Sequence, residues 1–211
     1  MKELIEIIRT KSRVVPEKGI VKSTALNQKF DPKLYTRCAQ EVKKYFDMKK
    51  VSIILTSEAS GIPFTSFISR EYNIPFIFAR KQKAANVQGG VYKATIHSYT
   101  FEKEVHLVVA KSLLSSKDKV LIVDDVVANG SAALGLIKIA KEAKAKVVGL
   151  ISLMEKKFQK GGDIIRKKGI KVVSLAPIVA MDKDGTLHFE GDKILKKEKK
   201  YAKTKKTIKR K

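Results

Sequence analysis

The stretch 120–132 most limits what this chain can fold into, because an apolar strand runs there directly into two carboxylates and a small-residue turn. Residues 120–123 have the unbroken apolar character of a strand that is covered on both faces. Residues 132–144 carry apolar side chains at helical spacing. Asp124 and Asp125 are therefore predicted to lie at a strand-to-helix junction of an α/β protein with a mostly parallel sheet.

The turn that follows the two carboxylates suits a phosphate group. The first N–H groups of a helix have no partner within the helix, and the helix dipole is positive there. A diol or a magnesium complex would satisfy the two adjacent carboxylates. The alternative interpretation of this segment is a plain buried strand that ends in a polar turn. The residues predicted to bind the phosphate are Ala128, Asn129, Gly130, Ser131 and Ala132.

A second segment follows the same plan of strand, small-residue loop and helix. The apolar run 51–57 precedes the loop 58–63, and a helical pattern then continues through Tyr72. Two such loops at one end of a sheet would face each other across a topological switch point, where α/β folds bind ligands. Ala59, Ser60 and Gly61 would offer backbone N–H groups to an anion. An ordinary strand–helix connection explains this loop equally well.

Cations follow two further apolar strands. The run 74–79 is followed by Arg80, Lys81 and Lys83, and the run 147–154 is followed by Lys156. The three charges after the first run indicate an anionic ligand. For any one of these three, a solvated side chain in a lysine-rich chain is the plainer interpretation.

These segments resemble the type I phosphoribosyltransferases, and most closely their xanthine phosphoribosyltransferase branch. The resemblance rests on 57–62, 78–81 and 128–130, is supported by 155–161, and spans roughly 20–189. It implies a central, mostly parallel sheet flanked by helices, with a small hood and a mobile lid arm. It also implies transfer of the 5-phosphoribosyl group from phosphoribosyl pyrophosphate (PRPP) to N9 of xanthine, giving XMP and pyrophosphate in purine salvage.

The resemblance implies roles for individual side chains around PRPP. Asp124 and Asp125 would be the catalytic carboxylates, holding the ribose hydroxyls directly or through Mg²⁺ that is bound mainly by PRPP. Ser60, Arg80 and Lys81 would hold the pyrophosphate end. The spacing of the histidines predicts no metal site of their own.

On the base side, the resemblance implies contacts from the hood. Lys156 can donate hydrogen bonds to a purine oxo group, and Phe158 supplies a ring for the base face. Positions matching Ile20 and Asn27 would also touch the base. Residues 20–30 show no clear periodicity, although Asp31 and Pro32 cap a helix predicted over 33–48.

The glycine-led stretch 88–100 alternates like a strand arm. In the resembling family the mobile lid lies here, and Ser98 and Tyr99 would meet the pyrophosphate when it closes. A plain surface hairpin is the alternative for each residue.

The chain of 211 residues has a formal charge of +24, and residues 193–211 hold eleven Lys or Arg against one Glu. We expect one domain over 1–190, with a hood from about 1–30 and 155–190, and a flexible basic tail over 191–211. Non-specific contact of the tail with nucleic acid, or docking on RNA, is an alternative to a role in solubility alone. One cysteine, no apolar membrane span and no signal peptide predict a cytoplasmic protein, and the resemblance implies a homodimer.

Other functions stay open at this point. Hypoxanthine or guanine transfer fits the same motifs, whereas orotate transfer matches poorly at 156–161. A regulatory module related to purine repressors would keep the PRPP motif without turnover. Because 1–19 is too short for a separate DNA-binding domain with its own core, the repressor is the weaker alternative.

Overall fold

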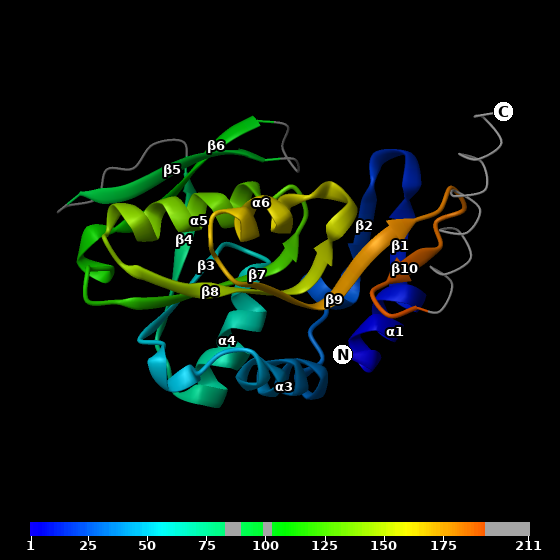
Figure 1. Cartoon of the computed structure of the whole chain (residues 1–211), viewed down its shortest axis with the longest axis horizontal. Coiled ribbons are helices and arrows are strands. Elements are labelled where there is room, and N and C mark those ends of the chain that lie inside the picture. Colours follow the sequence, from blue (N-terminus) through cyan, green and yellow to red (C-terminus); the bar gives the residue numbers. More distant parts are fainter. Residues whose placement is uncertain (83–89, 99–102, 193–211) are drawn as a thin grey trace, which may run out of the picture.

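An eight-stranded sheet forms the centre of the structure, a computed structural model in which residues 1–82, 90–98 and 103–192 are described (Figure 1). Its strands are β3 (Ile53–Ser57), β4 (Phe76–Gln82), β5 (Val91–Ser98), β6 (Lys103–Ala110), β7 (Lys119–Val127), β8 (Lys146–Lys156), β9 (Val172–Met181) and β10 (Leu187–Phe189). They lie in the order β10-β9-β8-β7-β3-β4-β6-β5. The strands from β9 to β4 are parallel, and β10, β6 and β5 each join antiparallel to a neighbour. The predicted α/β class with a mostly parallel sheet is confirmed.

The continuous apolar runs of the sequence form the strands of this sheet, and helices cover both of its faces. All five residues of β3 are buried, as expected for a central parallel strand. The strand predicted over 120–123 is longer than predicted, since β7 continues to Val127. Val127 still pairs with Glu155 of β8, so Asp124 and Asp125 lie within the strand and not in the turn.

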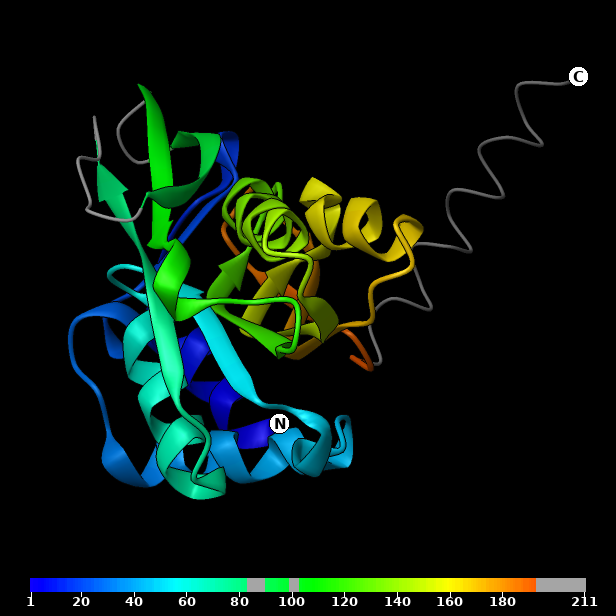
Figure 2. The same ribbon diagram turned by 90° about the vertical axis from the view of Figure 1, so that its left-hand side faces the viewer.

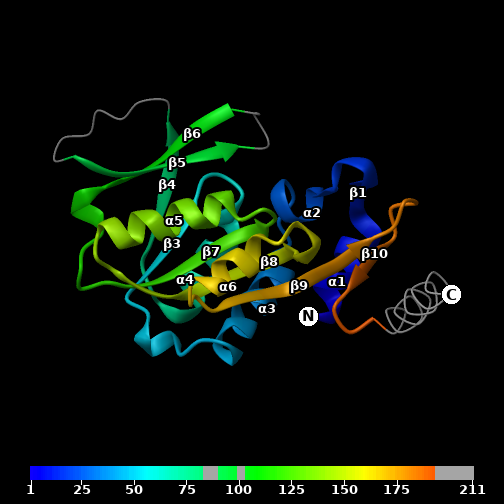
Figure 3. The same cartoon turned by 45° about the horizontal axis from the view of Figure 1, so that its top comes forward.

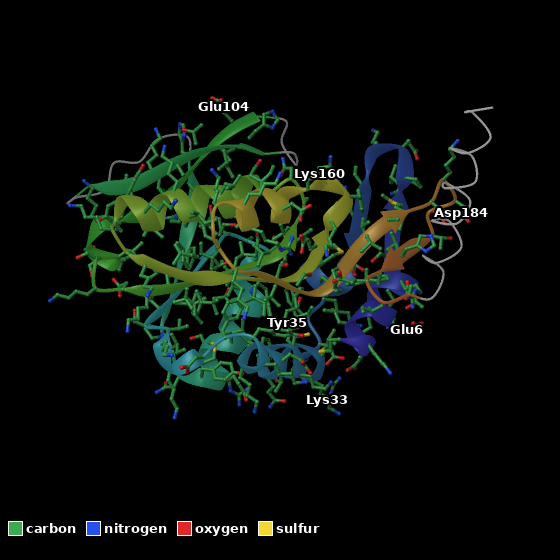
Figure 4. All side chains as sticks on the ribbon, in the orientation of Figure 1. Glu6, Lys33, Tyr35, Glu104, Lys160 and Asp184 are labelled. Atoms are coloured by element: carbon green, nitrogen blue, oxygen red, sulfur yellow. The ribbon has the colours of Figure 1, made fainter. Side chains whose placement is uncertain are left out.

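Helices α3 (Pro32–Glu41) and α4 (Gly61–Tyr72) pack on one face of the sheet, and α5 (Ser131–Glu142) and α6 (Gly161–Lys167) on the other (Figures 1 and 2). Successive residues of β7 alternate between these layers: Leu121 belongs to the core with α3 and α4, and Ile122 to the core with α5. Tyr35 of α3 lies beneath the sheet (Figure 4), and its hydroxyl donates to the Leu26 carbonyl at 2.9 Å.

The helix predicted over 33–48 is wrong in its second half. Asp31 does cap the helix, accepting hydrogen bonds from the next backbone N–H groups. However, α3 ends at Glu41 and is followed by the short 3₁₀ helices η2 (Val42–Lys44) and η3 (Met48–Lys50). Between these two short helices Phe46 packs on the sheet, where a Cβ on Gly149 would lie only 2.3 Å from its ring.

The N-terminal elements stand at the end of the sheet where β7 and β8 finish (Figures 1 and 3). They are α1 (Lys2–Lys11), β1 (Ser12–Val15), η1 (Pro16–Lys18), β2 (Ile20–Ser23) and α2 (Thr24–Asn27). β1 and β2 form an antiparallel hairpin, and the Met1 amino group donates to the Leu175 carbonyl of β9 at 2.7 Å. Residues 20–30 thus contain regular structure, in elements of four residues that are too short to give a periodic pattern.

The strand predicted within 88–100 is confirmed as β5, which pairs with β6 and lies across α5 (Figure 3). The close packing depends on Gly135 of α5, because a Cβ there would lie 2.6 Å from Ile96. The 3₁₀ helix η4 (Lys111–Leu113) follows β6.

Most of the predicted basic tail, 193–211, falls outside the described residues. The described chain ends at Asp192, whose carboxylate accepts from the backbone N–H of Phe189 at 2.8 Å and from Arg9. None of the helices within the described ranges is long and apolar enough to cross a bilayer.

Candidate active site

A cavity of about 560 Å³ opens at the carboxyl ends of β3, β7 and β8. After β3 the chain passes through α4 to β4 on one side, and after β7 it passes through α5 to β8 on the other. The cavity therefore lies at the predicted topological switch point. The predicted site residues that line it are Ile20, Ser60, Lys81, Asp124, Asp125, Ala128, Asn129, Ser131, Ala132 and Lys156.

The two carboxylates lie side by side in the floor of the cavity. Asp124 is only 5% exposed, and its carboxylate accepts the backbone N–H of Asp125 at 3.0 Å. Burial, reinforced by the negative charge of Asp125, raises the pKa of Asp124 well above its usual range. Within residues 1–82, 90–98 and 103–192 neither carboxylate forms an ion pair. A hydroxyl-rich or cationic ligand would therefore relieve an unfavourable pair of charges.

The approach of α4 to Asp124 depends on Gly61. A Cβ at this position would lie 2.2 Å from the Thr56 hydroxyl oxygen and 3.7 Å from an Asp124 carboxylate oxygen. Any side chain would thus force the start of α4 away from β3 and β7. The small residue in the loop, which the sequence suggested for anion binding, also serves packing beside the carboxylates.

The turn after β7 presents the N-terminus of α5 to the cavity. Gly130 is the N-cap with φ 85°, a left-handed conformation that favours glycine. The Asn129 side chain accepts the Ser131 N–H at 3.1 Å, and Leu134 N–H donates to the Gly130 carbonyl at 2.8 Å. Because the first N–H groups of the helix point toward its N-terminal end, the turn is built for an anion.

Gly130 does not line the cavity but packs against the start of α6. Gly161 N–H donates to the Ala128 carbonyl at 3.1 Å. A Cβ on Gly161 would lie 2.3 Å from the Asn129 carbonyl carbon, so the two backbones are in direct contact. The paired glycines at 161 and 162 are the sequence signal for this contact, which was not predicted.

Strand alternation separates the two cations predicted for the pyrophosphate end. Lys81 lines the cavity, and its backbone N–H donates to the Glu58 carboxylate at 2.5 Å. Arg80 faces the other side of β4, where it lines an apolar groove of about 480 Å³ with Phe78. The structure thus brings Ser60 and Lys81 together but not Arg80, and Lys83 lies outside the described residues.

Lys156 ends β8 on the opposite wall of the cavity. Its side chain is buried, and its ammonium donates to the Gly19 carbonyl at 3.1 Å. Burial lowers the pKa of Lys156, and the Asp125 charge opposes that shift. Ile20 lines the same wall.

The remaining predicted residues are not placed in the cavity. Phe158, in the 3₁₀ helix η5 (Lys157–Gln159), packs on the hydrophobic core and is not a lining residue. Asn27 and Ser98 end α2 and β5, but their side chains fall outside the described part of the chain, as does all of Tyr99. The contacts predicted for these four residues stay predictions.

Several lining residues were not anticipated. Lys18 and Gly19 come from the β1–β2 hairpin, His97 from β5 and Gln159 from η5. The sequence could have indicated Gln159, because it lies three residues after Lys156, which follows a predicted strand. A glycine between two short strands gives no such signal.

The carboxylate pair fits a magnesium ion that takes its other ligands from water and substrate. Mg²⁺ prefers oxygen ligands and is usually held by one or two carboxylates together with phosphate groups. Among the described residues no three His, Cys, Asp or Glu side chains gather around one point, so no protein-only metal cage is formed there. Asp124 and Asp125 are the residues available to such an ion.

Comparison with known proteins agrees with this geometry. The family model described as "Phosphoribosyl transferase domain" matches residues 30–183. The chain is 39% identical over 185 residues to a xanthine phosphoribosyltransferase of Lachnoclostridium phytofermentans, covering 87% of this chain and 95% of that protein. It is 41% identical to the protein of that name from Oceanobacillus iheyensis, over 85% of this chain and 95% of the relative.

Solved structures give the same fold. Adenine phosphoribosyltransferase from Saccharomyces cerevisiae matches with a TM-score of 0.68 and 21% identity, over 83% of this chain and 99% of that chain. The enzyme from Thermoanaerobacter pseudethanolicus matches with a TM-score of 0.67 and 21% identity, over 82% and 99%. At this identity the likeness concerns the fold alone. From the matched domain and the curated relatives together, the chain belongs to the phosphoribosyltransferase family.

Proposed function

We propose that this protein is a xanthine phosphoribosyltransferase, which transfers the 5-phosphoribosyl group of PRPP to N9 of xanthine. The observation that carries the proposal is the convergence of Asp124 and Asp125, the turn before α5 and Lys156 on one cavity of about 560 Å³. These are the groups that a ribose, a 5′-phosphate and an oxopurine require. The curated relatives that bear this name match most of the chain.

In this proposal each wall of the cavity holds one part of PRPP. The turn 128–132 binds the 5′-phosphate through backbone N–H groups, and Asp124 and Asp125 accept hydrogen bonds from the ribose diol. Ser60 and Lys81 hold the pyrophosphate, whose negative charge increases as it departs. Asp124 and Asp125, together with PRPP, would hold Mg²⁺, which would supply positive charge to offset that of the departing pyrophosphate.

The chemistry is substitution at C1′ of the ribose. The bond from C1′ to the pyrophosphate oxygen breaks and its electron pair leaves with pyrophosphate, while N9 forms the new bond to C1′ and releases its proton. The transition state resembles an oxocarbenium ion, so the protein accelerates the reaction by positioning the partners and stabilising charge. Closure of the β5–β6 arm, with Ser98 and Tyr99, would exclude water from that cation.

Base selection is assigned to the wall formed by β8 and the hood. Lys156 donates to an oxo group of the purine, and Ile20 supplies an apolar contact beside it. Asn27 completes the proposed base contacts, whereas a contact of Phe158 with the base stays a prediction, because its ring packs on the hydrophobic core. The hood is the part formed by about 1–30 and 155–190.

The first experiment compares purines as acceptors. We expect the purified protein, with Mg²⁺ and PRPP, to release pyrophosphate fastest with xanthine when xanthine, hypoxanthine, guanine and adenine are tested separately. A preference for hypoxanthine or guanine would keep the reaction and change the base assignment. PRPP binding without turnover on any base would contradict the proposal and indicate a regulatory module.

We also propose that two copies associate through the groove behind β4. Phe78 and Leu113, which both line it, are 41% and 53% exposed, so two large apolar side chains share one exposed groove. Sedimentation equilibrium of the full chain is expected to give the mass of two chains, and a Phe78→Ser, Leu113→Ser variant the mass of one. A monomeric wild-type protein would contradict this assignment.

A cytoplasmic location and the flexibility of the basic tail remain expectations from the sequence.

A further inference from the structure

Two side-chain donors in the base wall converge on one backbone oxygen. The Gly19 carbonyl accepts from the Lys156 ammonium at 3.1 Å and from the Gln159 side-chain amide, also at 3.1 Å. All three residues line the cavity. A single carbonyl oxygen of the hood thus occupies the point at which both donors are aimed.

The convergence is fixed by the backbone on both sides. Gly19 follows the 3₁₀ turn η1 with φ 61°, which directs its carbonyl toward the end of β8. A Cβ at Gly19 would lie 2.8 Å from the Gln159 amide nitrogen, so the two segments are in close contact. Lys156 ends β8 and Gln159 ends η5, the next short element, which places both donors on one wall.

We propose that Gln159 is a second base-recognition residue, which together with Lys156 donates to the 6-oxo group of the purine in place of the Gly19 carbonyl. The assignment rests on the proposed function. A ligand oxygen at this point would satisfy both donors, as the peptide oxygen does in the free protein. Adenine carries an amino group at position 6, which is itself a donor, so Lys156 would lose its acceptor and the Gln159 amide would have to turn away from the position that it holds in the free protein.

The same geometry makes the β1–β2 hairpin a competitor of the base. Entry of an oxopurine would exchange two hydrogen bonds to Gly19 for two hydrogen bonds to the ligand. The net cost of binding would therefore be small for a carbonyl and large for an amino group. Discrimination between oxopurines and aminopurines would come from this exchange.

The test replaces Gln159 by leucine, which keeps the size of the side chain and removes its hydrogen bonds. We expect Gln159→Leu to raise KM for xanthine about 3–10-fold, the effect of one lost hydrogen bond, with the dissociation constant for PRPP unchanged. Selectivity for xanthine over adenine, measured as the ratio of kcat/KM values, should fall. The matched control is Gln40→Leu, because Gln40 is exposed on α3, on the other face of the sheet.

A role limited to holding the hairpin predicts the opposite sign. Without the bond to Gly19 the base would meet less competition, so KM for xanthine would fall or stay unchanged and selectivity would be kept. Either result, with an unaltered melting temperature, would overturn the proposal. Wild-type turnover on xanthine is measured first, since its absence would overturn the proposed function together with this assignment, whereas a Gln159→Leu enzyme equal to wild type would overturn this assignment alone.

Discussion

Replacing Arg166 with leucine is expected to lower the free energy of unfolding by about 3–5 kcal/mol, because the change leaves a buried carboxylate without its partner. That carboxylate belongs to Glu155, which is 1% exposed and lies directly before Lys156 in β8. Arg166 of α6 holds it with two hydrogen bonds, at 2.8 and 2.7 Å. Urea denaturation followed by circular dichroism measures the loss.

The control for this variant is the neighbouring lysine of the same helix. Lys167 is exposed, so Lys167→Leu is expected to change the free energy of unfolding by less than about 0.5 kcal/mol. The double variant Glu155→Leu, Arg166→Leu should recover part of the stability, since it leaves no buried charge. If the single Arg166 variant were as stable as wild type, Glu155 would have to be hydrated, contrary to its burial in the structure.

Asp124→Asn and Asp125→Asn together are expected to lower kcat/KM by more than about 100-fold, the scale of losing a charge-stabilising group in an active site. Amide groups present an N–H donor where the ribose hydroxyls need acceptors, and they offer weaker oxygen ligands to Mg²⁺. Steady-state kinetics and calorimetric titration with PRPP provide the measurements.

The same variant should not lose stability. Because burial raises the pKa of Asp124, ionising this side chain disfavours the folded state, and that cost grows as the pH rises above the ordinary range of a carboxyl group. A neutral asparagine removes the cost, so the melting temperature at neutral pH should hold or rise. Glu71→Gln, an exposed carboxylate on α4, serves as the control. Unchanged turnover and PRPP affinity in the double variant would show that the two carboxylates do not bind PRPP.

The central part of the fold could be predicted because parallel strands leave a strong sequence pattern. Strands buried on both faces are continuous apolar runs, and the residues after them gather at one edge of the sheet. This is why Asp124, Lys81 and Lys156 were found from the sequence and lie around one cavity. Alternation along β4 places Arg80 on the face opposite Lys81, so the shared charge of these two neighbours did not predict a shared site.

The hood could not be predicted in the same way. The three hood elements β1, β2 and α2 have four residues each, too few for a periodic pattern. The hood contributes the Gly19 carbonyl oxygen to the cavity wall. This oxygen accepts hydrogen bonds from side chains about 140 residues away in the sequence. A contact made by backbone atoms across such a separation depends on the finished fold and has no signature in the residue types.

The backbone contact between Gly161 and the turn at Ala128 and Asn129 also limits how this enzyme can change its preference among bases. The four residues from Lys157 to Lys160 connect the end of β8 to that contact. An insertion or deletion among them would displace Gly161 and, with it, the turn proposed to bind the 5′-phosphate. New base preferences in this scaffold are therefore expected to arise by exchanging side chains within a connection of constant length.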